Sequence, residues 1–163
     1  RLAEVAREVE SETVRFAAPA RGAVALAASA SMASELPFII VRGETKEYGT
    51  ANRIEGPFDR GDLVCLLEDV VTSGGALAES VSALREAGLV VRHAVCVVDR
   101  EEGGADALAR LGVRLRSLYR ASDLLAGRSP DGEPGAGGAS DRLERLGRGL
   151  GSAWVSRNDR PEC

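Results

Sequence analysis

Apolar residues follow two alternating patterns along the first 125 residues. Where they recur every three or four positions they predict helices, and where a short run is apolar at nearly every position it predicts a strand. The predicted helices cover residues 1–10, 23–36, 76–88 and 101–112, with a closing turn of helix at 121–125. Gly88 is expected as a C-cap, and Ser122 is a possible cap of the closing turn. The predicted strands lie within residues 13–22, 37–42, 63–71, 93–99 and 113–119.

Strands that are apolar on both faces and alternate with helices are typical of a parallel sheet covered by helices on both sides. Successive parallel strands need crossover connections, which are almost always right-handed. We therefore expect an α/β fold with an open, mainly parallel sheet flanked by helices.

Two stretches interrupt the alternation. Residues 42–61 form an aperiodic loop of about twenty residues, and loops of this length inside a domain are usually functional or mobile. From Gly127 the chain becomes dense in Gly, Pro, Ser and Asp, a composition that favours disorder. We expect one α/β domain over residues 1–126, a linker over 127–141, and a tail over 142–163 that forms at most a loosely docked helix.

Composition narrows the class of protein. A formal net charge of -4 and a pI near 5.2 give no basic footprint for nucleic acid or for an anionic membrane. No apolar run approaches the roughly 20 residues that span a bilayer. Cys65 and Cys96 lie in apolar runs and Cys163 in the tail, without paired spacing, so we expect reduced thiols and a cytoplasmic protein. His93, the only histidine, opens a predicted strand and is expected at the surface or a sheet edge.

The candidate chemistry lies in residues 63–76, LVCLLEDVVTSGGA. A buried strand ends in Glu68 and Asp69, and a turn rich in hydroxyl groups and glycine leads into a helix. A Walker-type loop needs a lysine that is absent here, and a dinucleotide motif places its acid about twenty residues after the glycines. Both phosphate-binding alternatives fail on the order of residues.

A ligand with a phosphate close to a vicinal diol fits this order. Backbone N–H groups of Val71 to Ala76, the hydroxyls of Thr72 and Ser73 and the helix dipole can hold a phosphate. The two carboxylates can accept hydrogen bonds from ribose hydroxyls, or lie beside a Mg²⁺ that those hydroxyls coordinate. Ribose 5-phosphate is the smallest ligand that satisfies both. The competing interpretation is a solvated acidic turn before an ordinary helix.

Three segments resemble one enzyme family. LLEDVVTSGG resembles the phosphoribosyl pyrophosphate motif of the type I phosphoribosyltransferases. RGETKEYGTANRIEG, from Arg42, resembles the mobile catalytic loop of the orotate phosphoribosyltransferases, and CVVDREEGG, from Cys96, resembles their base-side strand end. The resemblance covers residues 13–125. It implies the transfer of phosphoribosyl from phosphoribosyl pyrophosphate to orotate, giving orotidine 5'-monophosphate and pyrophosphate in pyrimidine nucleotide biosynthesis.

The resemblance also implies roles for individual residues. Lys46, Arg42 and Asp69 would be catalytic, and Thr72 and Arg100 would contact orotate. Mg²⁺ would be held through the substrate near Glu68 and Asp69, without a direct protein ligand. The residues expected to bind phosphoribosyl pyrophosphate are Arg21, Gly22, Arg42, Lys46, Tyr48, Glu68, Asp69, Val70, Val71, Thr72, Ser73, Gly74, Gly75 and Ala76.

Several alternatives stay open at this level. In the family the catalytic loop reaches the neighbouring subunit's site, which implies a homodimer with shared active sites. Gly43 stands where a second basic residue is usual, and the family's N-terminal hood segment over orotate is missing, through either truncation or divergence. A divergent chain could use another base, or be a regulator or partner subunit that binds the donor without turnover. Arg42 and Lys46 could belong to a mixed-charge surface loop, and Arg100 could cap a strand beside Asp99.

Overall fold

A six-stranded sheet runs through the computed structural model, which describes residues 1–20, 22–43 and 53–128. The strands are ordered β3-β2-β1-β4-β5-β6, and every neighbouring pair is parallel except β2 and β3. Their bounds are β1 Arg15–Pro19, β2 Phe38–Val41, β3 Ile54–Glu55, β4 Leu63–Val71, β5 Val90–Asp99 and β6 Arg114–Arg120. The expected open, mainly parallel sheet is confirmed.

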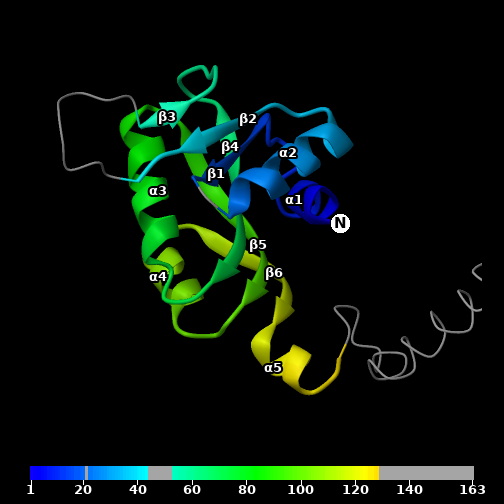
Figure 1. Ribbon diagram of the computed structural model, residues 1–163. Coiled ribbons are helices and arrows are strands. Elements are labelled where there is room, and N and C mark those ends of the chain that lie inside the picture. The colour runs from blue at the N-terminus through cyan, green and yellow to red at the C-terminus, as the bar shows by residue number, and fades with distance from the viewer. Residues whose placement is uncertain (21, 44–52, 129–163) are drawn as a thin grey trace, which may run out of the picture.

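Helices cover both faces of the sheet (Figure 1). One face carries α1 and α2, which contact β1, β4 and β5, and the other carries α3 and α4. The short α5 follows β6 and contacts it. The helix bounds are α1 Leu2–Val9, α2 Ala23–Ser34, α3 Gly75–Glu86, α4 Gly104–Arg110 and α5 Ala121–Leu125.

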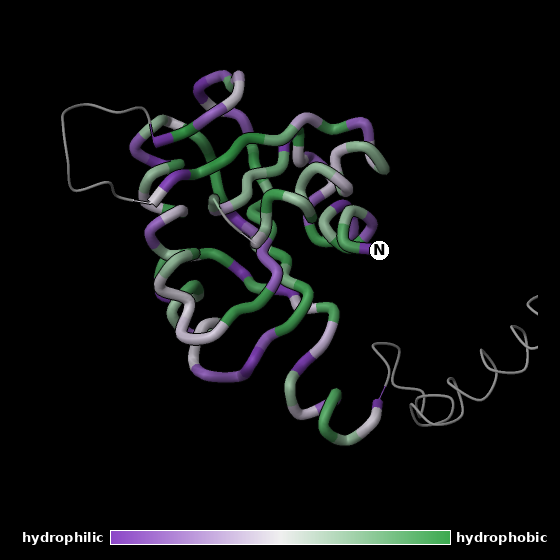
Figure 2. The backbone as a smooth tube through the Cα atoms, viewed as in Figure 1, coloured by the Kyte–Doolittle hydropathy of each residue, from purple (hydrophilic) through white to green (hydrophobic). Residues whose placement is uncertain are grey.

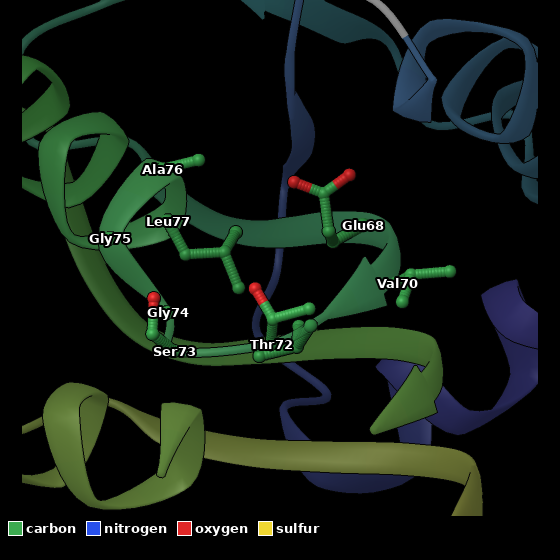
Figure 3. A pocket seen from close by; sticks show the side chains of 9 residues that line it. Glu68, Val70, Thr72, Ser73, Gly74, Gly75, Ala76 and Leu77 are labelled. Atoms are coloured by element: carbon green, nitrogen blue, oxygen red, sulfur yellow. The ribbon is translucent and has the colours of Figure 1, made fainter. Parts of the chain in front are cut away.

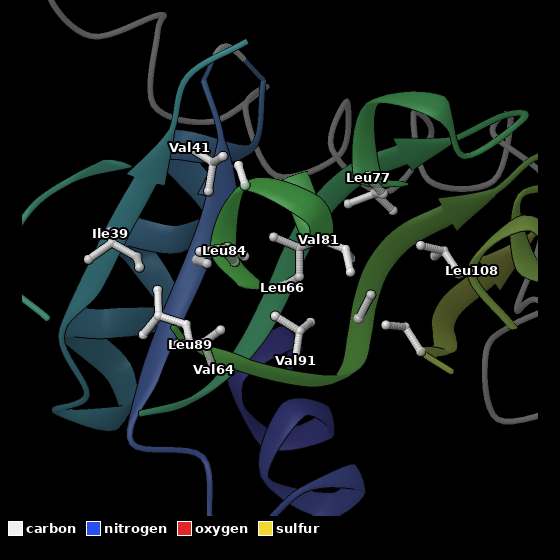
Figure 4. Close-up of a cluster of buried hydrophobic side chains, with 14 of the residues drawn as sticks. Ile39, Val41, Val64, Leu66, Leu77, Val81, Leu84, Leu89, Val91 and Leu108 are labelled. Atoms are coloured by element: carbon white, nitrogen blue, oxygen red, sulfur yellow. The ribbon is translucent and has the colours of Figure 1, made fainter. Parts of the chain in front are cut away.

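Strand β4 joins the two hydrophobic cores. Leu66 belongs to the cluster under α3 and α4, whereas Cys65 and Leu67 belong to the cluster under α1 and α2. Successive side chains of a strand point to opposite faces of the sheet. All three are fully buried because helices cover both faces. The strands accordingly form the hydrophobic centre of the molecule (Figure 2), and the α3-side cluster packs over β2, β4 and β5 (Figure 4).

Two features of the sheet differ from expectation. Strand β5 begins at Val90, three residues before its predicted start, because Val90 and Val91 pair with Leu63 and Val64. Strand β3 lies inside the predicted loop and pairs antiparallel with β2, placing the buried Ile54 beside Val41. A two-residue strand has no period of its own, so periodicity could not reveal it.

The helix ends were predicted with mixed success. Gly88 follows the C-cap of α3 with a positive φ of 89°, as expected for a helix-terminating glycine. Ser122, in contrast, is not the N-cap of α5, which begins after Arg120. The backbone N–H of Ser122 instead donates a hydrogen bond of 2.9 Å to the Glu101 carboxylate, a partner 21 residues earlier.

None of the helices within the described residues is long and apolar enough to cross a membrane. The predicted linker and tail lie almost entirely in residues 129–163, outside the described part of the chain.

The position of β4 predicts the effect of a core truncation. Leu66→Ala should lower the free energy of unfolding by about 2–5 kcal/mol, because it leaves a cavity at a fully buried site. Met32→Ala, at a side chain that is 86% exposed, is the control and should change it by less than about 0.5 kcal/mol. Chemical denaturation measures both; equal effects would contradict the assignment of Leu66 to the core.

Candidate active site

The carboxyl ends of four parallel strands meet at one edge of the sheet. Strands β1, β2, β4 and β5 end at Pro19, Val41, Val71 and Asp99, and their registers place these ends side by side. Open α/β sheets bind ligands in the crevice outside this edge. The last residues of β4 and the loops after these strands carry the residues singled out in the sequence that the structure describes.

A pocket of about 110 Å³ lies where β4 turns into α3 (Figure 3). It brings together Glu68 and the predicted phosphate turn, and the first residues of α3 close it. No side chain caps this helix, so the N–H groups of its first turn remain available to an anion. The lining residues are Glu68, Val70, Val71, Thr72, Ser73, Gly74, Gly75, Ala76 and Leu77.

Glu68 is a buried carboxyl group at this pocket. It is a residue of β4, three positions before the strand ends, and it is 8% exposed. Burial, followed by the hydrogen bonding and charge of neighbouring Asp69, raises the pKa of Glu68 to about 7. The backbone N–H of Asp69 donates a 3.1 Å hydrogen bond to Glu68 Oε1. Glu68 is therefore partly protonated near neutral pH until a ligand donates hydrogen bonds to its carboxylate.

Asp69 faces a different loop from Glu68. It does not line the pocket, and its carboxylate lies against Gly22 in the turn after β1. A Cβ at Gly22 would come within 2.2 Å of Asp69 Oδ2, so no other residue fits there without moving this carboxylate. The two adjacent acids thus border two neighbouring parts of the crevice, one beside the phosphate turn and one beside the β1 turn.

Two glycines hold the loops after β4 and β5 in direct contact. A Cβ at Gly104 would lie 2.4 Å from Val71 Cγ1 and 2.6 Å from the Thr72 carbonyl oxygen, and a Cβ at Gly74 would lie 3.0 Å from Gly104. Gly74 was a predicted site residue, but the contribution of Gly104 was missed. Its signal was the glycine pair in CVVDREEGG, which the sequence alone could not connect to the phosphate turn.

Arg100 does not line the pocket in this structure. Its backbone N–H donates a 2.9 Å hydrogen bond to the Val71 carbonyl, whereas its exposed guanidinium pairs with Glu102 at 2.7 Å. Glu101 braces the same loop: its N–H donates to the Asp99 carboxylate at 2.8 Å and its own carboxylate accepts from Ser122. Arg100 therefore stands at the correct edge, on a loop fastened to β4 and α5.

The remaining predicted residues have mixed outcomes. Arg42 follows β2 at the same edge, but its exposed guanidinium pairs with Glu55 of β3. Arg21, Lys46 and Tyr48 lie outside the described residues. Their roles stay predictions.

The structure shows how far Cys65, Cys96 and His93 are buried. Cys65 and Cys96 are buried free thiols, and burial raises the pKa of each to about 12, so neither supplies a thiolate. The expectation for His93 was wrong, because it is a 6% exposed residue of the interior strand β5. A single polar residue before an apolar run does not reveal that a helix covers it.

Together these features favour binding of a phosphorylated diol over thiol chemistry. The helix N-terminus and the hydroxyl-rich turn suit a phosphate, and the two carboxylates suit neighbouring hydroxyls. Hard carboxylate oxygens also suit Mg²⁺, and Glu68 and Asp69 stand close enough in sequence to face one such ion through a ligand.

Sequence comparison identifies relatives of known name, although no protein-family model matches the chain. The orotate phosphoribosyltransferase of Natronomonas pharaonis is 49% identical over 114 residues, which cover 70% of this chain and 66% of that protein. The Methanocella arvoryzae enzyme of the same name is 46% identical over 121 residues, covering 74% and 69%. The chain thus spans about two thirds of the length of the curated relatives it matches.

Solved structures agree with this relationship. The crystal structure of orotate phosphoribosyltransferase from Aeropyrum pernix has a TM-score of 0.69 at 32% identity and covers 77% of this chain and 72% of that one. The Mycobacterium tuberculosis enzyme, solved in complex with 5-phospho-α-D-ribosyl 1-diphosphate, has a TM-score of 0.62 at 28% identity, covering 76% and 73%. The chain belongs to the orotate phosphoribosyltransferase family.

Proposed function

We propose that this protein transfers phosphoribosyl from phosphoribosyl pyrophosphate to orotate, giving orotidine 5'-monophosphate and pyrophosphate. The observation that carries the proposal is the pocket at the end of β4, where Glu68 and an uncapped helix N-terminus lie together at the ligand-binding edge of the sheet. One relative of similar fold binds this same donor. The reaction is a step of pyrimidine nucleotide biosynthesis.

The donor would span the two parts of the crevice. Its 5-phosphate fits the turn from Thr72 to Gly75, and its ribose hydroxyls donate hydrogen bonds to Glu68 and Asp69. Its pyrophosphate then extends toward Gly22, because the Asp69 carboxylate borders that turn. Arg21 next to Gly22, together with Arg42 and Lys46 of the loop after β2, supplies the positive charge that a departing pyrophosphate needs.

The chemistry breaks the bond from the anomeric carbon to a pyrophosphate oxygen and forms one from that carbon to a ring nitrogen of orotate. The bonding electrons leave with pyrophosphate, and the orotate nitrogen loses its proton. The protein's main task is to position both partners and to stabilise the leaving group. Mg²⁺ bound to the donor would neutralise part of the pyrophosphate charge. The Arg100 guanidinium can exchange Glu102 for the orotate carboxylate, a planar anion that suits an arginine fork.

We also propose that the active protein is a homodimer, in which the loop carrying Lys46 and Tyr48 serves the neighbouring site. The support is membership of a family in which this loop is shared between subunits. A cytoplasmic location likewise stays a proposal, supported by the two buried free thiols.

Turnover and donor binding can be separated by experiment. Purified protein with Mg²⁺, phosphoribosyl pyrophosphate and orotate should consume orotate absorbance. Lys46→Ala should lower kcat by about 100-fold or more, because it removes a charge that acts on the leaving group, while donor binding stays nearly intact. Asp69→Asn should weaken donor binding first. Donor binding without turnover across a panel of bases would instead indicate a regulator or partner subunit.

The raised pKa of Glu68 predicts a pH-dependent trade between stability and binding. Its pKa is about 7 in the folded protein and 4.5 normally. The contribution of protonated Glu68 to the free energy of unfolding is therefore fully present below pH 4.5 and is lost as the pH rises through 7. Glu68→Gln removes this loss. The gain in unfolding free energy on substitution should therefore be larger at pH 8 than at pH 5, by on the order of 3 kcal/mol. The same variant should bind the donor more weakly.

Denaturation curves and donor titrations at the two pH values provide the measurement for Glu68. Glu79→Gln, at an exposed glutamate of α3, is the matched control and should show neither effect. A stability gain that does not grow between pH 5 and pH 8 would contradict a buried, hard-to-ionise Glu68.

The contact between Gly104 and the turn after β4 predicts that Gly104→Ala lowers the free energy of unfolding, opposite to the effect expected from helix propensity. Gly104 begins α4, where alanine is the better helix former by about 1 kcal/mol, so helix propensity alone predicts that Gly104→Ala stabilises. The close approach to Val71 and Thr72 predicts the opposite, a loss of about 1–3 kcal/mol and a higher KM for the donor. Ala105→Ser adds one atom at the next, exposed position and should change neither quantity.

A further inference from the structure

A second pocket lies at the opposite edge of the sheet from the candidate active site. It has a volume of about 240 Å³ and is lined by Val9, His93, Arg114, Leu115 and Arg116. His93 is the fourth residue of β5 and Arg114 the first of β6, and the two pair in register. Asp99 ends β5 six residues after His93, so about 20 Å of strand separates this pocket from the active-site edge.

The polar side chains of this pocket share the sheet face covered by α1. His93 and Arg114 are register partners, as are Val95 and Arg116, and partners in parallel strands point to the same face. Val95 belongs to the hydrophobic cluster beneath α1, and Val9 at the end of α1 packs against that cluster. Two arginines and one histidine therefore converge beside the last turn of α1.

His93 has a buried ring nitrogen that is not hydrogen-bonded within the described residues. Its side chain is 7% exposed, and its Nδ1 has no hydrogen-bond partner among the described residues. The nearest charge, Glu10 Oε2, lies 3.4 Å from Nδ1, and Arg92 at 3.7 Å also approaches that carboxylate. An unsatisfied polar side chain at a pocket wall is costly unless a ligand or water completes it.

Arg114 and Arg116 are exposed residues of β6. Neither forms an ion pair with a carboxylate of the described residues, so both guanidinium groups are available to an anion. They stand two residues apart on one strand, roughly 7 Å along it, in a chain whose net charge is negative. Such a spacing allows two guanidinium groups to hold one doubly charged anion from both sides.

We propose that this pocket binds a small phosphate-bearing anion, held by Arg114 and Arg116, with the His93 imidazole completing the site. The apolar wall provided by Val9 leaves room for a small organic group beyond the phosphate. This site is separate from the donor turn, and binding here does not depend on the proposed transferase activity.

The lone histidine makes the site directly observable. Because His93 is the chain's only histidine, the imidazole resonances of untagged protein report on this pocket and not on the donor turn. Inorganic phosphate and ribose 5-phosphate are titrated separately, each with chloride at matched ionic strength as a reference. Saturable shifts of the imidazole resonances are expected with at least one of them, and a larger response to the ester would identify an organic phosphate as the natural ligand class.

Charge-matched variants decide between a built site and diffuse attraction. Arg116→Gln and Arg114→Gln should each weaken the anion's effect on His93 at least about tenfold, because each removes a charge-assisted contact. Arg110→Gln, an exposed arginine of α4, should leave it unchanged. Circular dichroism checks that each variant is folded. The absence of saturable shifts in the unmodified protein, or equal weakening by Arg110→Gln, would overturn the proposal, whether or not the transferase activity is found.

Discussion

The backbone contact between the loops after β4 and β5 is the constraint on which the candidate site depends. Gly104 lies so close to Val71 and the Thr72 carbonyl that a side chain at position 104 would clash with them. The Arg100 N–H also donates a hydrogen bond to the Val71 carbonyl. The turn that suits a phosphate and the loop that carries Arg100 are thereby fixed to each other. A reaction between two bound substrates needs this kind of fixed separation, because misplacement by an ångström lowers the rate steeply.

Glu68 shows that a carboxylate placed inside an α/β sheet lowers the stability of the protein when it is ionised. Its carboxyl group lies near the end of a strand that is buried on both faces, and burial raises its pKa to about 7. An ionised carboxylate there is destabilising until hydroxyl donors reach it, whereas Asp69, one residue later, is less buried and faces the β1 turn. Adjacent acids therefore differ in burial and in the part of the crevice that they border.

The two edges of the sheet carry separate chemistry. At the carboxyl edge, glycine turns and a helix N-terminus offer backbone N–H groups, and the acids Glu68 and Asp69 stand beside them. At the amino edge, Arg114, Arg116 and His93 offer side-chain donors beside α1. Both edges can recognise anions, but the first does so through backbone geometry that most sequences could not provide, and the second through charge placed on an outer strand.

Sequence alone determined the α/β class, the buried strand β4, the turn after it and the family, because alternating periodicity and a compact motif are local properties of the chain. Contacts between distant segments were decided only by the tertiary structure. Three such contacts join different segments: Gly22 with Asp69, Gly74 with Gly104, and Glu101 with Ser122. The burial of His93 likewise depends on neighbouring elements. Periodicity cannot encode such contacts, because they follow from how strands align in the sheet and which helix covers which face.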